Sequence, residues 1–127
     1  MIGALDRAQV AMPAGRGAEA RAFYSGLLDL EEMEKPAALS GRGGAWFALP
    51  DGRQLHLGVE DPFRPSSKAH PAFTVHALDE LAERISASGL PVRWDDELAP
   101  RRRFYGEDPF GNRLEFLEPE APHRVHI

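Results

Sequence analysis

The chain has 127 residues, which is enough for one domain or for two very small halves that share a core. Hydrophobic residues make up 43% and charged residues 28%, a balance that is typical of globular domains and excludes a disordered or fibrous protein. Fifteen Lys and Arg against 20 Asp and Glu give a net charge of −5, so we expect neither nucleic acid nor a membrane as partner. The absence of cysteine excludes disulfides, thiolate metal sites and thiol nucleophiles. No apolar run reaches the roughly 18 residues of a membrane span, and the N-terminus has no signal-peptide pattern, so we expect a cytoplasmic location.

The first half of the sequence predicts a strand, a helix and three further strands. Residues 5–12 alternate apolar and polar side chains, which indicates a strand, and residues 18–28 repeat apolar side chains at helical spacing. The turn at residues 50–53 (PDGR) has the chemistry of a hairpin, because proline presets one dihedral angle and glycine accepts a positive φ. The three further strands are predicted at residues 31–34, 45–49 and 54–59.

The second half repeats this order of elements after a linker. Residues 60–68 contain two prolines and two serines without periodicity, which indicates the linker. A strand is predicted at 69–75 and a helix at 78–88, followed by Gly89 at the position of a helix C-terminal glycine. Three strands follow at 92–95, 103–107 and 113–117, the last two joined by a hairpin turn at 108–112.

The two halves also match in sequence around their last hairpins. Residues 50–57 align with residues 109–116 with proline, glycine and leucine in register. A repeated unit buries its apolar face against its neighbouring copy, so a duplication predicts one domain over residues 1–127. The expected fold class is α+β: two tandem βαβββ modules that form a curved mixed-sheet cup with helices packed on the outside. Module one is expected at 1–60, the linker at 60–68, module two at 69–119 and a tail at 120–127.

Strand alternation separates an apolar face of this sheet from a polar one. Such a polar face is also typical of the wet side of an ordinary antiparallel sheet. Here, however, His56 matches Glu115 and Arg7 matches His70 at equivalent positions of the two halves. If the sheets curl around a common axis, two imidazoles and a carboxylate converge and form a site for a divalent transition metal. The polar face carries Arg7, Gln9, His56, His70, Thr74 and Glu115.

Three segments make the chain similar to the vicinal oxygen chelate superfamily, and the resemblance covers residues 5–119. Residues 22–30 (AFYSGLLDL) resemble the family's helix, 70–75 (HPAFTV) the first strand of its second module, and 108–115 (DPFGNRLE) its closing hairpin. The family contains glyoxalases, extradiol dioxygenases, fosfomycin-inactivating thiol transferases and bleomycin-binding resistance proteins. Because one scaffold hosts several reactions, the resemblance predicts the fold and the superfamily rather than the reaction.

The resemblance implies a metal-dependent enzyme as one hypothesis. It places metal ligands on His56, His70 and Glu115, which would hold Zn, Ni, Fe or Mn and polarise vicinal oxygens of a small-molecule substrate, as in a lyase, isomerase or dioxygenase. Glu115 is also the candidate catalytic residue. The first-strand ligand position, usually histidine, falls on Arg7, whose guanidinium cannot coordinate a cation. The candidate substrate-binding residues are Arg7, Gln9, Trp46, Thr74, Arg103 and Tyr105.

The second hypothesis is a metal-free protein that sequesters a small molecule, as in the bleomycin-resistance branch. In that case Arg7 replaces the metal and closes the site by pairing with Glu115. The aromatic side chains expected to line its cleft are Trp46, Trp94, Phe104 and Tyr105.

The resemblance further implies a homodimer in which two chains complete two cups. If the chains exchange modules, His56 and Glu115 of one site come from different chains. His123 and His126 in the tail are only minor candidates for metal binding.

Overall fold

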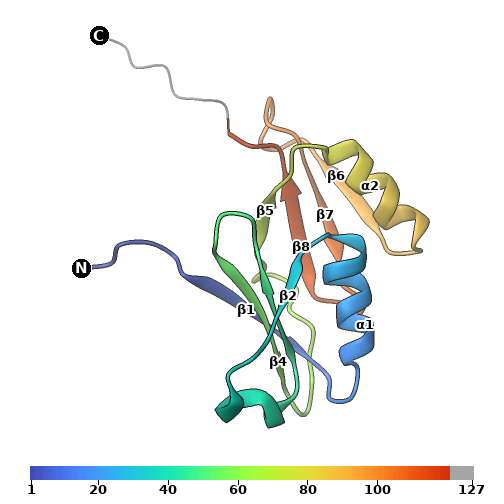
Figure 1. The fold of residues 1–127 in the computed structure, drawn as a ribbon. Coiled ribbons are helices and arrows are strands. Elements are labelled where there is room, and N and C mark those ends of the chain that lie inside the picture. Colours follow the sequence, from blue (N-terminus) through green and yellow to red (C-terminus); the bar gives the residue numbers. More distant parts are fainter. Residues whose placement is uncertain (121–127) are drawn as a thin grey trace.

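The computed structural model describes residues 1–120, which form two four-stranded sheets of the same topology. In each sheet the edge strand that begins the module runs parallel to its last strand, and the other pairings are antiparallel. The identical strand orders confirm the predicted duplication and the tandem βαβββ architecture (Figure 1). The first sheet, in the order β1-β4-β3-β2, contains β1 (Arg7–Met12), β2 (Glu31–Met33), β3 (Ala45–Ala48) and β4 (Gln54–Val59). The second, in the order β5-β8-β7-β6, contains β5 (Ala72–Thr74), β6 (Val92–Asp95), β7 (Arg103–Glu107) and β8 (Arg113–Leu117).

The helices follow the prediction with local differences. The first predicted helix is α1 (Gly17–Arg21), which passes directly into the π-helix η1 (Ala22–Leu27), and the second is α2 (Leu78–Ala87). A 3-10 helix, η2 (Ala37–Arg42), lies between the strands predicted at 31–34 and 45–49, where no helix was predicted. Its short-range hydrogen bonds require no apolar periodicity, so periodicity could not reveal it. Among residues 1–120, no helix combines the length and hydrophobicity that crossing a membrane requires.

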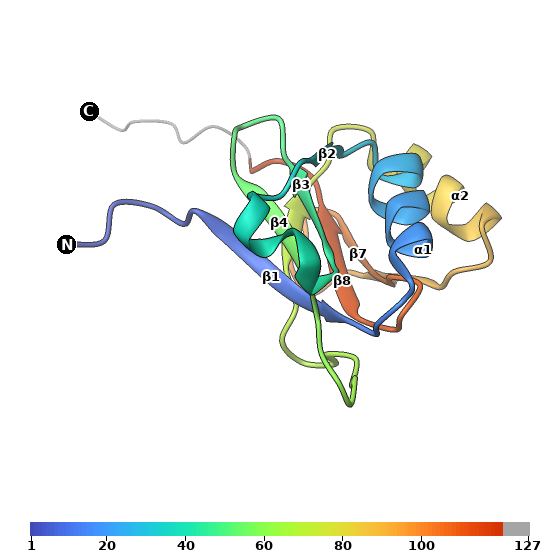
Figure 2. The same cartoon turned by 60° about the horizontal axis from the view of Figure 1, so that its bottom comes forward.

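One hydrophobic core joins the two modules. The apolar side of each sheet packs against helices, and α1 and α2 lie next to each other on the same side of the molecule (Figure 2). Burial of each large apolar side chain contributes roughly 1.5–3 kcal/mol to stability. Val59, on the same side of β4 as Leu55 and Leu57, is an exception with 36% exposure at the end of the strand. The buried strand residues include Val10, Met12, Phe47, Leu55, Leu57, Phe104, Leu114 and Phe116.

Buried polar contacts also fasten the second module to the first. The hydroxyl of Tyr24 in η1 donates to Asp108 Oδ2 at 2.8 Å, and Asn112 Nδ2 donates to the Ala11 carbonyl of β1 at 2.7 Å. Asp108 and Asn112 are 1% and 0% exposed, so both bonds are shielded from water. Each sheet has a second face, turned away from α1 and α2, that carries its polar side chains; we call it the open face. The buried contacts and the shared core determine the directions in which the two open faces point.

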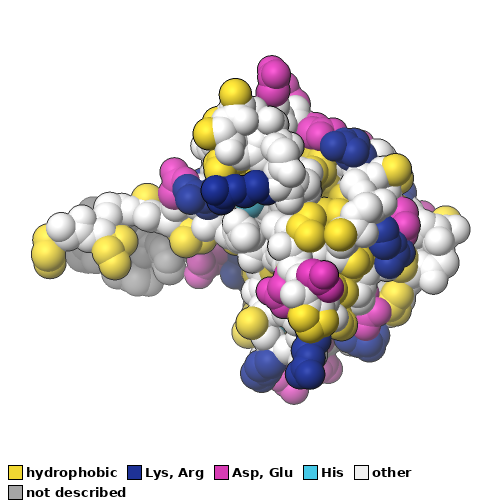
Figure 3. Space-filling view, turned by 90° about the horizontal axis from the view of Figure 1, so that it is seen from below, with side chains coloured by type: hydrophobic (Ala, Val, Ile, Leu, Met, Phe, Trp, Pro, Cys, Tyr) yellow, Lys and Arg dark blue, Asp and Glu magenta, His cyan; other side chains and the backbone are white. Residues whose placement is uncertain are grey.

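The N-terminal segment lies outside this core. Met1, Ile2 and Leu5 are exposed, and the segment projects from the body with hydrophobic side chains on its surface (Figure 3).

Candidate functional site

His56 lies in the middle of the open face of the first sheet. In register it is opposite Gln9 of β1 on one side and Trp46 of β3 on the other. Its ring stacks on that of Trp46 with centroids 3.8 Å apart and 13° between the planes, and its Nε2 lies 2.8 Å from Gln54 Oε1. The residue is 4% exposed. Stacking and hydrogen bonding therefore hold the imidazole in one orientation.

The surroundings of His56 favour its neutral form. Burial lowers its pKa, the positive charges of Arg7 and Lys35 lower the pKa further, and Asp6 opposes them. A neutral imidazole retains a lone pair, which is the form that a metal ion or a proton donor requires. Arg7 itself makes an exposed ion pair with its neighbour Asp6 at 2.9 Å. The open face of the first sheet thus combines a neutral histidine with nearby cations.

His70 and Glu115 form a close pair on the open face of the second sheet. His70 Nε2 lies 2.8 Å from Glu115 Oε1, and His70 Nδ1 lies 2.8 Å from the Lys68 carbonyl oxygen. Because a carbonyl can only accept, Nδ1 carries a hydrogen, and Nε2 must share a proton or another cation with the carboxylate. Metal-binding histidines are commonly held in this way by a second hydrogen bond to a carbonyl. The donor set and its anchoring therefore fit a divalent metal ion.

Arg103 connects this pair to the rest of the second open face. Its Nη1 donates to Glu115 Oε2 at 3.3 Å and its Nε to Asp95 Oδ1 at 3.0 Å. The guanidinium lies over the ring of Tyr105, 5.0 Å from the centroid, and that of Arg113 lies 4.1 Å from the same centroid. The Arg103 and Glu115 side chains are 11% and 9% exposed. Sequence reasoning included Arg103 and Tyr105 but missed Asp95 and Arg113, although strand alternation places all four on one face.

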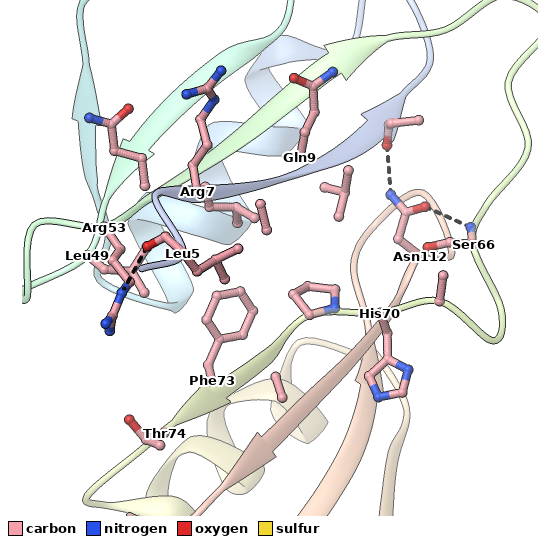
Figure 4. A pocket seen from close by; sticks show the side chains of 18 of the residues that line it. Leu5, Arg7, Gln9, Leu49, Arg53, Ser66, His70, Phe73, Thr74 and Asn112 are labelled. Atoms are coloured by element: carbon pink, nitrogen blue, oxygen red, sulfur yellow. Dashed lines mark hydrogen bonds between the residues drawn. The ribbon is translucent and has the colours of Figure 1, made fainter. Parts of the chain in front are cut away.

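Within one chain the two open faces do not meet. Figure 4 shows Arg7 and Gln9 projecting from β1 on the side away from β5, whereas His70, which precedes β5, projects in the opposite direction. No three His, Asp or Glu side chains of residues 1–120 lie close enough together to hold a metal ion. A single chain therefore brings His70 and Glu115 together but leaves His56 on another face.

The expected pairing of Arg7 with Glu115 does not form within the chain. Arg7 pairs with Asp6, and Glu115 is bound by His70 and Arg103. The reason is that the open faces of the two sheets point in different directions, so Arg7 and Glu115 do not face each other.

The remaining predicted residues divide between the open faces and the core. Thr74 lines a cavity of about 840 Å³ between β1 and β5, whose wall also includes Arg7, Gln9 and His70. Phe104 is fully buried in the core, and Trp94 packs on it with ring centroids 5.1 Å apart. These two aromatic residues therefore face the core side of the second sheet rather than its open face.

The prediction did not include Gln54, which is hydrogen-bonded to His56. Gln54 is two residues before His56, so strand alternation places it on the same face and could have identified it. His123 and His126 lie outside the described residues.

The fold and its two polar open faces define a class of small α+β proteins built from paired βαβββ modules. The chain belongs to the Glyoxalase/Bleomycin resistance protein/Dioxygenase superfamily, whose family model matches residues 7–116. A comparison with curated proteins finds no significant match.

Solved structures agree with this assignment. A protein from Bacillus anthracis, described as a member of the glyoxalase family, is 43% identical, with a TM-score of 0.88 over 94% of this chain and 98% of its own. A glyoxalase/dioxygenase from Nostoc punctiforme is 26% identical, with a TM-score of 0.69 over 88% and 90% of the two chains. The fosfomycin resistance protein FosX from Listeria monocytogenes, in a mutant form complexed with Mn(II) and 1S,2S-dihydroxypropylphosphonic acid, is 20% identical, with a TM-score of 0.77 over 94% and 95%. The likeness to FosX concerns the fold alone.

Proposed function

We propose that the protein is a metal-dependent enzyme acting on a small molecule with vicinal oxygens, and that it works as a homodimer. His70 and Glu115 of one chain and His56 of a second would hold the divalent metal ion. The observation that carries this proposal is the His70–Glu115 pair, in which Nε2 and a carboxylate oxygen lie 2.8 Å apart while the Lys68 carbonyl anchors the other ring nitrogen. In the metal-free protein this pair must share a proton, which a metal ion would displace.

The placement of the proposed ligands within one chain supports the dimer. His56 is paired in register with Gln9, which projects away from His70 (Figure 4), so in this proposal a second chain supplies His56. The strands β1 and β5 each pair on one side only and leave an edge free for a further contact.

The side chains around the pair have separate tasks in this proposal. The metal ion, when bound, supplies Lewis-acid polarisation of substrate oxygens. Glu115 would accept a proton as well as bind, and Arg103 would hold its carboxylate in place, because Nη1 donates to Oε2 at 3.3 Å. Tyr105, with the guanidinium of Arg103 over its ring, would orient the substrate. Whether the reaction is an isomerisation, an elimination or a dioxygenation depends on the substrate.

A metal-free binding protein is the second candidate. The observation that favours it is the placement of Arg7, a permanent cation close enough to His56 to lower its pKa. A guanidinium there disfavours a second cation and would supply the positive charge that a metal otherwise provides.

Metal content distinguishes these two functions. The protein is dialysed against chelator, loaded separately with Mn, Zn, Ni and Fe(II), and analysed by mass spectrometry. We expect about one equivalent per chain for at least one metal, lost in His70→Ala and Glu115→Gln and weakened in His56→Ala. His76→Ala, which changes a histidine outside the proposed ligand set, is the matched control and should retain the metal. Failure of all four metals to bind would contradict the enzyme proposal and leave the binding protein.

A further inference from the structure

The guanidinium of Arg7 lies on the open face of β1 and makes no ion pair with another element among residues 1–120. It is opposite Gln54 of β4 in register. Its ion pair is with the adjacent Asp6, and the two side chains are 53% and 80% exposed. An exposed pair of this kind contributes little to stability, so the guanidinium can exchange this partner for a ligand.

The amide of Gln9 lies beside this charge and is also available. Gln9 is opposite His56, and its next neighbour along β4 is Gly58. A Cβ atom built on Gly58 would lie 2.5 Å from Gln9 Nε2 and 3.2 Å from its amide carbon. Gly58 thus leaves the space in which the Gln9 amide lies against β4. No hydrogen bond holds this amide in the part of the chain that the structure describes.

Two cations and one carboxylate lie near His56. Arg7 and Lys35 are the cations that act on its imidazole, and Asp6 is the acidic residue that opposes them. The Lys35 amine donates a hydrogen bond to the Gly43 carbonyl. A small molecule that brings negatively charged oxygens would balance this excess of positive charge.

We propose that Arg7 and Gln9 form a subsite for an oxyanion on the substrate, a carboxylate or a phosphate-type group, directly beside His56. The inference rests on the proposed function in that it takes the open face of the first sheet to be part of the substrate site. A guanidinium binds two oxygens of such a group in parallel, and the Gln9 amide, turned over so that its N–H faces Arg7, adds a third donor. The substrate class is therefore an anionic small molecule whose charged end lies on the first module.

Anion binding is tested on the metal-free protein, so that its outcome is independent of metal loading. Inorganic phosphate and acetate are titrated separately at constant ionic strength, and the fluorescence of Trp46, which stacks on His56, is followed in a Trp94→Phe background. We expect saturable binding of at least one of the two ions, and the tighter one identifies the class of oxyanion. Arg7→Gln should weaken it by about 10- to 100-fold, the usual effect of removing hydrogen bonds to a charged group, and Arg7→Lys by less.

Two further variants sharpen the test. Gln9→Leu, which retains the shape of the side chain but removes the donor, should weaken binding by about 3- to 10-fold. Arg53→Gln is the matched control: Arg53 lines the same cavity, but its guanidinium is bound by Asp51 at 2.7 Å and by the Leu5 carbonyl at 3.3 Å. Its affinity should equal that of the wild type. No saturable binding in the wild type, or equal affinity in Arg7→Gln, would overturn the subsite. A protein that binds these ions but no metal would retain the subsite and lose the enzyme proposal.

Discussion

Gly44 and Gly52 share a backbone conformation but have different surroundings. Their φ angles are +79° and +89°, a region that side chains other than glycine adopt at a cost. A Cβ atom on Gly44 would lie 2.1 Å from the Leu57 carbonyl oxygen of β4, whereas nothing lies within 4 Å of one on Gly52. Glycine at position 44 is therefore required both by conformation and by the close approach of β4, the strand that carries His56.

Alanine substitutions should separate these two requirements. We expect Gly52→Ala to lower the free energy of unfolding by about 1 kcal/mol, the cost of the left-handed conformation alone. Gly44→Ala should lower it by about 3 kcal/mol or more, because the backbone of β4 must also move. Urea denaturation followed by circular dichroism measures both values. Equal losses in the two variants would contradict the close contact at Gly44.

The protonation of His56 should be visible in the fluorescence of Trp46. Because burial and the charges of Arg7 and Lys35 lower the pKa of His56, the midpoint of a pH titration of the metal-free Trp94→Phe protein should lie below the ordinary value of 6.5. The unfolded chain binds this proton more readily than the folded one. The contribution of His56 to stability is therefore complete above pH 6.5 and decreases as the pH falls from 6.5 through the lowered pKa.

Arg7→Gln supplies the control for this titration. Removing the nearby positive charge should raise the midpoint toward 6.5, since one of the causes that lower the pKa is lost. A midpoint at or above 6.5 in the parent protein would show that His56 is more accessible to water than the structure indicates.

At the scale of elements, the hairpin between β7 and β8 fastens one module to the other. Burial raises the pKa of Tyr24 well above 10.0, and the Asp108 carboxylate adds to the shift, so the hydroxyl remains a donor. Asp108 also accepts hydrogen bonds from the backbone N–H groups of Phe110 and Asn112. The segment that resembles the family's closing hairpin thus has a structural task in addition to carrying Glu115 into β8.

Removing the Tyr24 hydroxyl should weaken this fastening. We expect Tyr24→Phe to lower the free energy of unfolding by about 1–3 kcal/mol, because a buried carboxylate loses one of its donors. Tyr105→Phe is the control: Tyr105 is only partly buried, and within residues 1–120 its hydroxyl has no hydrogen bond, so the change should be within about 0.5 kcal/mol. Urea unfolding at neutral pH measures both. An equal effect of the two substitutions would contradict the role of the Tyr24–Asp108 bond.

The elements show where local patterns are reliable. The strands from 92 to 117 match their predicted bounds because alternation and turn residues are local properties. By contrast, β5 pairs only over Ala72–Thr74, whereas residues 69–75 were expected to form the strand. Pro71 lacks a backbone N–H, so the ladder cannot extend through it as a regular strand. The π-helical turn at Ala22–Leu27 is likewise not indicated by the apolar spacing, which predicted an ordinary helix.

At the scale of the whole molecule, the proposed site depends on two copies of the chain. A His56→Ala chain lacks the ligand of the first module, and a Glu115→Gln chain lacks one from the second. When the two are refolded together, each mixed dimer would contain one intact site and one doubly altered site. With random pairing, about a quarter of all sites would be intact.

Metal content and activity of the mixture test this arrangement. We expect the His56→Ala protein alone to bind metal weakly, the Glu115→Gln protein alone to bind none, and the refolded mixture to recover about a quarter of the wild-type content. Light scattering should give about twice the chain mass of 14.0 kDa. A mixture no better than its components would place the whole site within one chain or exclude a metal.

The sequence by itself determined the repeated modules, the face on which each side chain lies and the similarity of residues 22–30, 70–75 and 108–115 to one superfamily. These are consequences of local periodicity and turn chemistry, which need no knowledge of the partner element. Only the tertiary structure decided which polar residues meet. It joins His70 to Glu115 and Arg103 to Asp95, and it turns His56 away from them. The reason is that alternation assigns a side chain to a face, whereas the shared core and the buried Tyr24–Asp108 contact determine where that face points.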